Sequence, residues 1–172
     1  SPATSNFQRR LATRGRGTYD VTGQGQTVAV LDTGLNTSHM DFAGRIVAQR
    51  NFTRDNNGND DDATDGHGHG TNVAGIIAAR GDHIGIAPGA NVIPIKVLPD
   101  RTGGDFNWVD QALQWVSDHR EEYGISAVCM SLGDGGNYTT DDFGLSFFSV
   151  RNRIRNRIRT LREARVAVVI AA

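Results

Sequence analysis

Five short apolar runs alternate with stretches of helical spacing, and this alternation most constrains the fold. The runs, rich in β-branched residues, occupy residues 27–31, 46–48, 92–98, 127–130 and 166–170. Continuous apolar runs of this length are typical of strands buried on both faces, as in a parallel sheet covered by helices. Pro94 weakens the third run, because its nitrogen has no hydrogen to donate to a neighbouring strand.

Apolar residues recur at helical spacing between these runs. The first stretch follows Thr71 and ends near Gly81, and the second begins with Trp108 and stops before Gly124. A third stretch has one apolar stripe, formed by Val150, Ile154, Ile158 and Leu161. Strands that alternate with helices predict an α/β fold with a mostly parallel sheet. The polar, glycine-containing residues 1–26 are predicted to form an amino-terminal arm that precedes it.

Composition excludes several classes of protein. The 172 residues predict one domain, and 18 Lys+Arg against 19 Asp+Glu leave a net charge of −1, which favours neither nucleic acid nor a membrane surface. The single cysteine, Cys129, cannot form an internal disulfide. The apolar runs are far shorter than the roughly 18 residues that a membrane span needs. Residues 151–165 carry seven Arg and one Glu, which predicts a solvated helix face, with an acidic partner as the alternative.

Asp32 ends the first apolar run and is followed by Thr33 and Gly34. Ligands and catalytic groups gather beyond the carboxyl ends of the strands in open α/β sheets. Asp32 is therefore a candidate functional carboxylate. A helix cap or a turn residue explains it equally well at this point.

Two histidines, His67 and His69, lie among the three glycines of residues 66–70. Glycines leave a histidine without the packing neighbours of a core residue and let backbone segments approach closely. A helix that opens at Thr71 or Asn72 places His69 near a helix N-terminus, where the dipole disfavours imidazolium and helps to keep the ring neutral, as a general base must be. A buried carboxylate beside it would orient the ring and stabilise the imidazolium formed in catalysis.

These two segments, residues 28–34 and 69–75, resemble the Asp and His motifs of subtilisin-like serine proteases (subtilases, peptidase family S8). Residues 38–41, 85–88, 95–98 and 130–133 resemble further blocks of the same family in the same order. The resemblance covers roughly residues 22–172. It implies a three-layer subtilisin-like fold with a mostly parallel sheet, and makes residues 27–172 a partial catalytic domain.

The resemblance also implies roles for individual residues. Asp32 would be the triad carboxylate and His69 the general base of a serine endopeptidase. The backbone of Ser131, Leu132 and Gly133 would pair with an extended substrate peptide, and the less closely matching Gly103 and Gly104 would form the opposite binding segment. An ordinary exit from a strand into a loop is the alternative for Ser131 and Gly133.

The sequence departs from the family at two places. Asn72 stands where the family usually has a second histidine, which is not the base. The Gly-Thr-Ser motif of the nucleophile and the oxyanion-hole asparagine are absent, and the sequence stops after Ala171 and Ala172, just where Gly-Asn would begin. An apolar strand at 166–170 as the last element would also expose an aggregation-prone edge. We therefore expect a fold truncated before the last strands and the nucleophile helix, inactive alone, in a reading frame that continues to the serine.

A loop at residues 55–62 is rich in the oxygen ligands that Ca²⁺ prefers. Its candidate ligands are Asp55, Asn57, Asn59 and Asp61. Subtilisin-like proteases often bind calcium in surface loops, which supports a structural calcium; a solvated polar loop is the alternative. Asp41 resembles a calcium-coordinating position of some relatives, but the short connection 80–84 does not offer the loop that completes such a site.

Two other functions remain open from the sequence. The first is a metal-dependent hydrolase that uses His67 and His69 with Asp65 or His83, although it leaves the Asp32 motif unexplained. The second is a pseudoprotease or peptide-binding module without a nucleophile. The resemblance implies polypeptide substrates, the remaining carboxy-terminal portion or a prosegment as partners, and secretion, although no signal pattern opens this chain. No nucleic acid and no membrane span is expected.

Overall fold

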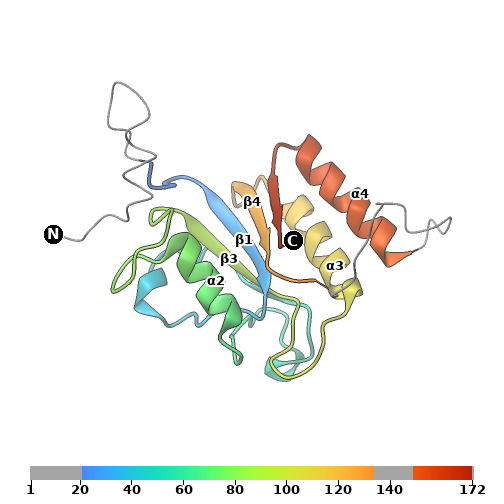
Figure 1. Ribbon diagram of the computed structural model, residues 1–172, viewed down its shortest axis with the longest axis horizontal. Coiled ribbons are helices and arrows are strands. Elements are labelled where there is room, and N and C mark those ends of the chain that lie inside the picture. Colours follow the sequence, from blue (N-terminus) through green and yellow to red (C-terminus); the bar gives the residue numbers. More distant parts are fainter. Residues whose placement is uncertain (1–20, 134–148, 172) are drawn as a thin grey trace.

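A parallel five-stranded sheet forms the middle layer of the molecule (Figure 1). The computed structural model describes residues 21–133 and 149–171. The strands are β1 (Thr27–Asp32), β2 (Arg50–Asn51), β3 (Asn91–Lys96), β4 (Ile125–Met130) and β5 (Ala167–Ile170). They lie in the order β2-β3-β1-β4-β5, and every pair is parallel. The predicted α/β class is therefore confirmed.

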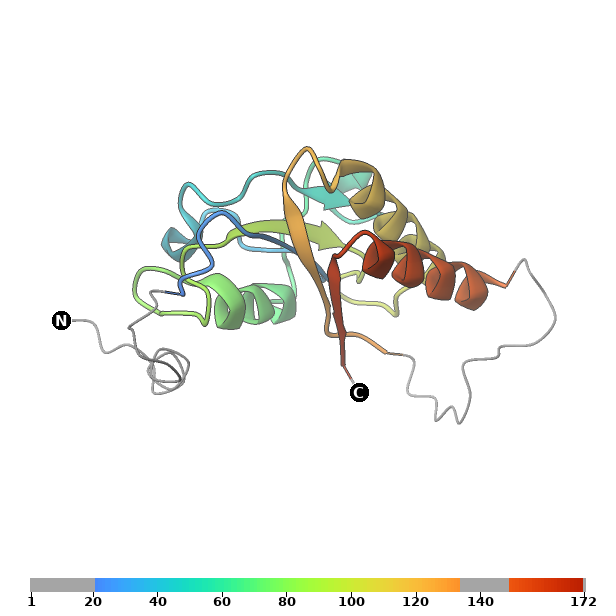
Figure 2. The same ribbon diagram turned by 90° about the horizontal axis from the view of Figure 1, so that it is seen from above.

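Helices cover both faces of the sheet (Figures 1 and 2). Helix α2 (His69–Ala78) covers one face, and helices α3 (Phe106–His119) and α4 (Val150–Glu163) cover the other. Two short 3₁₀ turns, η1 (Met40–Phe42) and η2 (Asn56–Gly58), lie in the loops. In β1, Leu31 packs in one core cluster with Leu113 of α3 and Leu161 of α4. The next residue back, Val30, packs in a second cluster with Ala74 of α2. Burial on both faces explains why the run is apolar without alternation.

The prediction of a strand at residues 46–48 is wrong. Ile46 makes only an isolated bridge to Val92, and the strand at this edge is the two-residue β2. The bonds on this side of β3 are Val92 N–H to the Arg45 carbonyl, Val47 N–H to the Val92 carbonyl and Phe52 N–H to the Lys96 carbonyl. Alternate residues of a strand bond on the same side, so the nitrogen of Pro94 faces this edge without a hydrogen. Pro94 thus interrupts the ladder between the bridge and β2.

The arginine-rich helix α4 packs its apolar stripe toward the sheet, with Leu161 fully buried. Its arginines form more than a solvated face, because two of them bind α3. The Nε atoms of Arg153 and Arg157 lie 2.7 Å and 3.3 Å from the two carboxylate oxygens of Asp110. These pairs join the two helices on the same side of the sheet.

The division of the chain at residue 26 stays a prediction, because most of the arm lies outside the described residues.

Asp41 in η1 is a buried carboxylate that fixes the connection between α2 and β3. One oxygen accepts a hydrogen bond from the Asp82 backbone N–H at 2.8 Å, and the other lies 3.0 Å from Nδ1 of His83. Burial alone would raise the pKa of Asp41, but the hydrogen bonds from His83 and Asp82 and the nearby His39 outweigh it, so the pKa is lowered. The ionised form therefore stabilises the folded state.

This lowered pKa predicts an acid-side loss of stability. A carboxyl whose folded pKa is depressed contributes stability that is present above its unfolded pKa, near 3.8, and is lost as the pH falls through the folded pKa. We expect Asp41→Asn to lower the free energy of unfolding at pH 7 and to flatten its fall below pH 4. Urea unfolding of both proteins between pH 2.5 and 7 measures this. Parallel stability curves at all pH values would contradict it.

Candidate active site

Asp32 and His69 lie in hydrogen-bond contact at the carboxyl end of the sheet. Asp32 is the last residue of β1, and His69 is the first residue of α2. Nδ1 of His69 lies 2.6 Å from Oδ1 of Asp32. The Asp32 side chain is fully buried, whereas 45% of the His69 side chain is exposed. The two residues that the sequence analysis predicted as a catalytic pair are therefore brought together, with the imidazole open to a reactant.

The pair can meet because the backbone segments that carry it are in close contact. A Cβ atom on Gly70 would lie 2.2 Å from the carbonyl oxygen of Gly34, and one on Gly34 would lie equally close to the Ala63 carbonyl oxygen. Gly34 also has a φ of 108°, which side chains rarely adopt. Gly70 thus permits the approach of α2 to the turn after β1, and Gly34 permits the approach of that turn to the backbone of Ala63.

Thr33 links the carboxylate to the helix that carries the histidine. Its backbone N–H donates to Oδ1 of Asp32 at 2.7 Å, and its hydroxyl oxygen accepts from the Gly70 N–H at 2.8 Å. The Thr33 hydroxyl in turn donates to Asp65 at 2.9 Å. A single residue thus orients the acceptor oxygen of Asp32 and fixes the first turn of α2 beside it.

Asp65 organises the loop before His69, a role that the sequence analysis missed. Besides the Thr33 hydroxyl, its carboxylate accepts the backbone N–H groups of His67, Gly68 and Thr71 and the Thr71 hydroxyl, all within 3.0 Å. Burial raises the pKa of Asp65, but these hydrogen bonds outweigh it, led by that from the Thr71 hydroxyl, and the pKa is lowered. The signal in the sequence was a carboxylate three residues before the N-cap Gly68, since carboxylates readily accept the free N–H groups at the start of a helix.

The geometry does not support the alternative of a metal-dependent hydrolase. Asp65 is occupied by hydroxyl and N–H donors, and His83 is bound to Asp41. The rings of His67 and His69 lie edge to face with centroids 6.3 Å apart. Over residues 21–133 and 149–171, no group of three or more His, Cys, Asp or Glu side chains is placed to hold a metal ion.

The contact with Asp32 defines the chemistry that His69 can perform. An ionised carboxylate only accepts hydrogen bonds, so Nδ1 of His69 carries the hydrogen and the lone pair of the neutral ring lies on Nε2. The ring can therefore take a proton at Nε2, and Asp32 stabilises the imidazolium that results.

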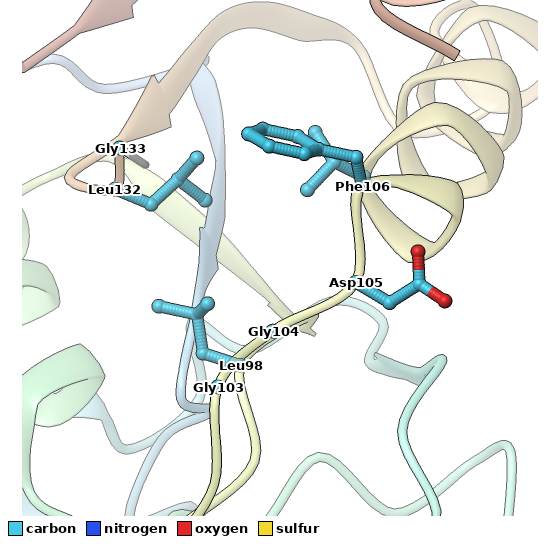
Figure 3. Close-up of a pocket in the computed structure, with 8 residues that line it drawn as sticks. Leu98, Gly103, Gly104, Asp105, Phe106, Leu132 and Gly133 are labelled. Carbon is cyan, nitrogen blue, oxygen red and sulfur yellow. The ribbon is translucent and has the colours of Figure 1, made fainter. Parts of the chain in front are cut away.

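Four of the five predicted peptide-binding residues line one hollow of about 250 Å³ (Figure 3). Gly103 and Gly104 lie on one side, and Leu132 and Gly133, beyond the end of β4, lie on the other. The side chains of Leu132 and Phe106 point toward one another across it, while the Asp105 carboxylate is turned away. The other lining residues are Leu98, Asp105, Phe106 and Val109. Ser131 lies outside the lining, with Oγ 4.0 Å from the Cys129 sulfur.

Three of the four candidate calcium ligands already have partners within the protein. Asp55 pairs with the Lys96 ammonium at 3.3 Å, and Asp61 pairs with Arg50 at 3.1 Å. The Asn59 side chain accepts the Asp61 N–H at 3.1 Å, which closes a local turn. Asn57 has a positive φ of 58° within η2. Because both carboxylates already face cationic side chains, this arrangement does not fit a calcium cage, and calcium binding by the loop stays a prediction.

Any calcium site in this loop would first have to break two ion pairs. We therefore expect calcium to bind no more tightly than the 10⁻⁴–10⁻³ M range, approximately, of the weakest protein sites. Titration calorimetry of the 172-residue chain measures this affinity, with Asp61→Asn as the variant that removes one candidate ligand. A micromolar dissociation constant that Asp61→Asn weakens at least tenfold would show that the loop rearranges around the ion.

Comparison with known proteins decides the family. A sequence model described as "Subtilase family" matches residues 23–172. The chain belongs to the subtilase family. Its similarity to curated subtilases includes 40% identity over 114 residues to "Intracellular serine protease" of Paenibacillus polymyxa and 39% over 117 residues to "Major intracellular serine protease" of Bacillus subtilis (strain 168). These alignments cover 64% and 66% of this subtilase and 34% and 35% of the relatives.

Solved structures confirm the predicted three-layer subtilisin-like fold. The subtilase is similar to "Sphericase" with a TM-score of 0.74 and to "S41 Psychrophilic Protease" with a TM-score of 0.73, each at 29% identity. Each comparison covers 96% of this chain and 51% of the solved chain. The chain therefore spans about half the length of these structures and about a third of the length of the two curated relatives.

None of the described helices is long and apolar enough to cross a membrane.

Proposed function

We propose that this chain is the amino-terminal part of a serine endopeptidase that hydrolyses polypeptides. The observation that carries the proposal is the 2.6 Å contact between the buried Asp32 and the half-exposed His69. Membership of the subtilase family supports a protease, and the coverage of about half of the solved relatives supports a longer parent protein. The nucleophilic serine would then lie in the sequence beyond residue 172.

The proposed reaction uses His69 as a proton carrier. Nε2 of His69 takes the proton of the serine hydroxyl while the serine oxygen attacks the carbonyl carbon of the scissile amide. The tetrahedral intermediate collapses when the imidazolium returns that proton to the leaving amine nitrogen, and an acyl-enzyme remains. Water then attacks the ester in the same way and regenerates the serine. Throughout, Asp32 holds the ring and stabilises its positive charge.

The hollow between Gly104 and Leu132 supports a peptide as the substrate. An extended peptide gains affinity by main-chain hydrogen bonds to strand-like segments on either side and gains selectivity from pockets for alternate side chains. Gly103 and Gly104 leave their backbone uncovered, and both are exposed. The apolar walls, Leu98, Phe106 and Leu132, would favour an apolar side chain of the substrate.

An internally quenched peptide blocked at both ends tests the proposed activity. We expect the product of the longer reading frame to cleave an internal bond, and we expect His69→Ala to abolish cleavage. The matched control is His67→Ala, a neighbouring exposed histidine whose side chain has no role in the proton transfer. Equal rates in His69→Ala and the unmodified protein would overturn the proposal.

The rival proposal of a peptide-binding module rests on the same hollow, which needs no catalytic residue to hold a peptide. Binding of the blocked peptide by the longer protein without cleavage would favour it.

Secretion also stays a prediction, since two of the similar proteins are named as intracellular. Fractionation of the source cells tests where the protein resides. A prosegment or the carboxy-terminal portion as a partner stays a prediction as well.

A further inference from the structure

Lys96 is a fully buried lysine at the end of β3, in register with Asp32 of β1. Its Nζ atom donates to the carbonyl oxygen of Thr33 at 2.6 Å and to Oδ1 of Asp100 at 2.5 Å. The carboxylate of Asp55 lies 3.3 Å away. Three oxygen atoms from three segments of the chain therefore surround one ammonium group directly beside the candidate catalytic strand.

These contacts connect the ammonium to the loop that carries His69. The oxygen of Asp100 that binds Lys96 also accepts the backbone N–H of Gly66 at 3.1 Å. A Cβ atom on Gly66 would lie 2.2 Å from the other Asp100 oxygen, so the loop backbone rests against this carboxylate. Asp55 is joined to the same group, because its carboxylate accepts the Asp100 N–H at 2.8 Å. The segment before His69 is thus tied to Lys96 through Asp100.

The second connection runs through Thr33. The carbonyl oxygen of Thr33 binds Lys96, while its N–H and its hydroxyl bind Asp32 and Gly70. One cation therefore holds both the backbone that orients the carboxylate and the loop that delivers the imidazole.

Charge balance makes the ammonium indispensable to this arrangement. An ionised group removed from water destabilises the folded state unless it is paired and hydrogen-bonded. Asp55 and Asp100 also repel one another, and the Lys96 charge is what holds them together. Removing it leaves two carboxylates converging beside the Thr33 carbonyl oxygen, so they would move apart and take Gly66 with them.

We propose that Lys96 is a positioning residue for His69, a role that rests on the proposed function of that histidine. The ammonium fixes Thr33 on one side and the Asp100–Gly66 contact on the other. The imidazole is thereby kept within hydrogen-bond distance of Asp32, with the hydrogen on Nδ1. The Lys96 ammonium also balances the negative charge of Asp55 in the acidic loop, as a bound cation would otherwise do.

Nuclear magnetic resonance of the 172-residue chain tests this proposal without any need for the serine. In Lys96→Met we expect the ¹⁵N signals of His69 to change from one tautomer to a mixture, and the amides of Gly66, Gly68 and Gly70 to exchange at least tenfold faster. The amide of Leu31 in the core should keep its exchange rate. The matched control is Arg50→Gln. It removes a cation that binds the acidic loop at residues 55–62 through Asp60 and Asp61 but is not bonded to Thr33.

Asp100→Asn provides a milder variant should Lys96→Met fail to fold, and it should give the same changes at the same residues. An unchanged His69 tautomer in either folded variant overturns the proposal. So does faster exchange throughout the core, because that would indicate a purely structural role. A tautomer change in a protein whose longer form cleaves no peptide would leave the role of Lys96 intact and refute the proposed function instead.

Discussion

Asp32→Asn should lower the kcat of peptide hydrolysis by the longer, serine-bearing protein about 10⁴-fold, the order of loss found when a triad carboxylate is replaced in other serine proteases. The carboxylate oxygen that accepts the His69 Nδ1–H at 2.6 Å would be replaced by an amide. An amide N–H at that position donates to Nδ1 and drives the hydrogen to Nε2. The ring then cannot take the serine proton, although the fold is unchanged.

The matched control for this variant is Asp41→Asn, because Asp41 is also a buried carboxylate bonded to a histidine, His83. It lies outside the proposed machinery, so kcat should be unchanged while stability falls. Steady-state kinetics from pH 6 to 10 measure both variants. A loss of less than tenfold in Asp32→Asn would contradict the role assigned to the pair.

Gly70→Ala should destabilise the chain by about 1–3 kcal/mol, the usual cost of overpacking, or prevent α2 from docking. The new Cβ atom would lie 2.2 Å from the Gly34 carbonyl oxygen, 3.0 Å from the Gly34 nitrogen and 3.2 Å from Cβ of Asp32. Two of these atoms belong to the backbone of the turn that follows β1. Because the backbone cannot rotate away as a long side chain can, α2 would have to move and would carry His69 away from Asp32.

Gly75→Ala in the same helix is the matched control. A Cβ atom there would meet nothing within 4 Å, and its backbone is helical. This variant should therefore stabilise the chain by about 0.4–1 kcal/mol, because alanine loses less conformational entropy than glycine in a helix. Urea unfolding of both variants measures the difference. A Gly70→Ala protein as stable as the Gly75→Ala protein would contradict the close contact between β1 and α2.

The sequence predicted those parts of the fold that local pattern controls. The apolar runs of β1, β3, β4 and β5 are all found as strands. Those of β1 and β3 are buried on both faces, whereas the edge strand β5 leaves Val169 and Ile170 exposed. The stripe of α4 faces the core as its spacing indicates. The run at 46–48 looked equally apolar, but its pairing depended on a hydrogen that Pro94 of another strand lacks. The pairing of two strands that are distant in sequence cannot be predicted from the residues of either strand alone.

The candidate site shows the same limit. Asp32 and His69 were predicted because their motifs are local, and the fold brings them together. Lys96 and Asp65 were missed as supporting residues, since their partners come from segments distant in sequence or act through backbone atoms. The acidic loop was predicted from composition as a calcium site, but the partners of Asp55 and Asp61 are cations placed by β3 and β2. Composition shows which ligands are present and not where they point.

The central claim is that this chain contributes the base and the carboxylate of a serine protease but not its nucleophile. Labelling with a fluorophosphonate, which reacts with an activated serine, tests it most directly. We expect the product of the longer reading frame to be labelled once per molecule, His69→Ala in that product to be unlabelled, and the 172-residue chain to be unlabelled. Strong labelling of the 172-residue chain, or none of the longer product, would contradict the claim.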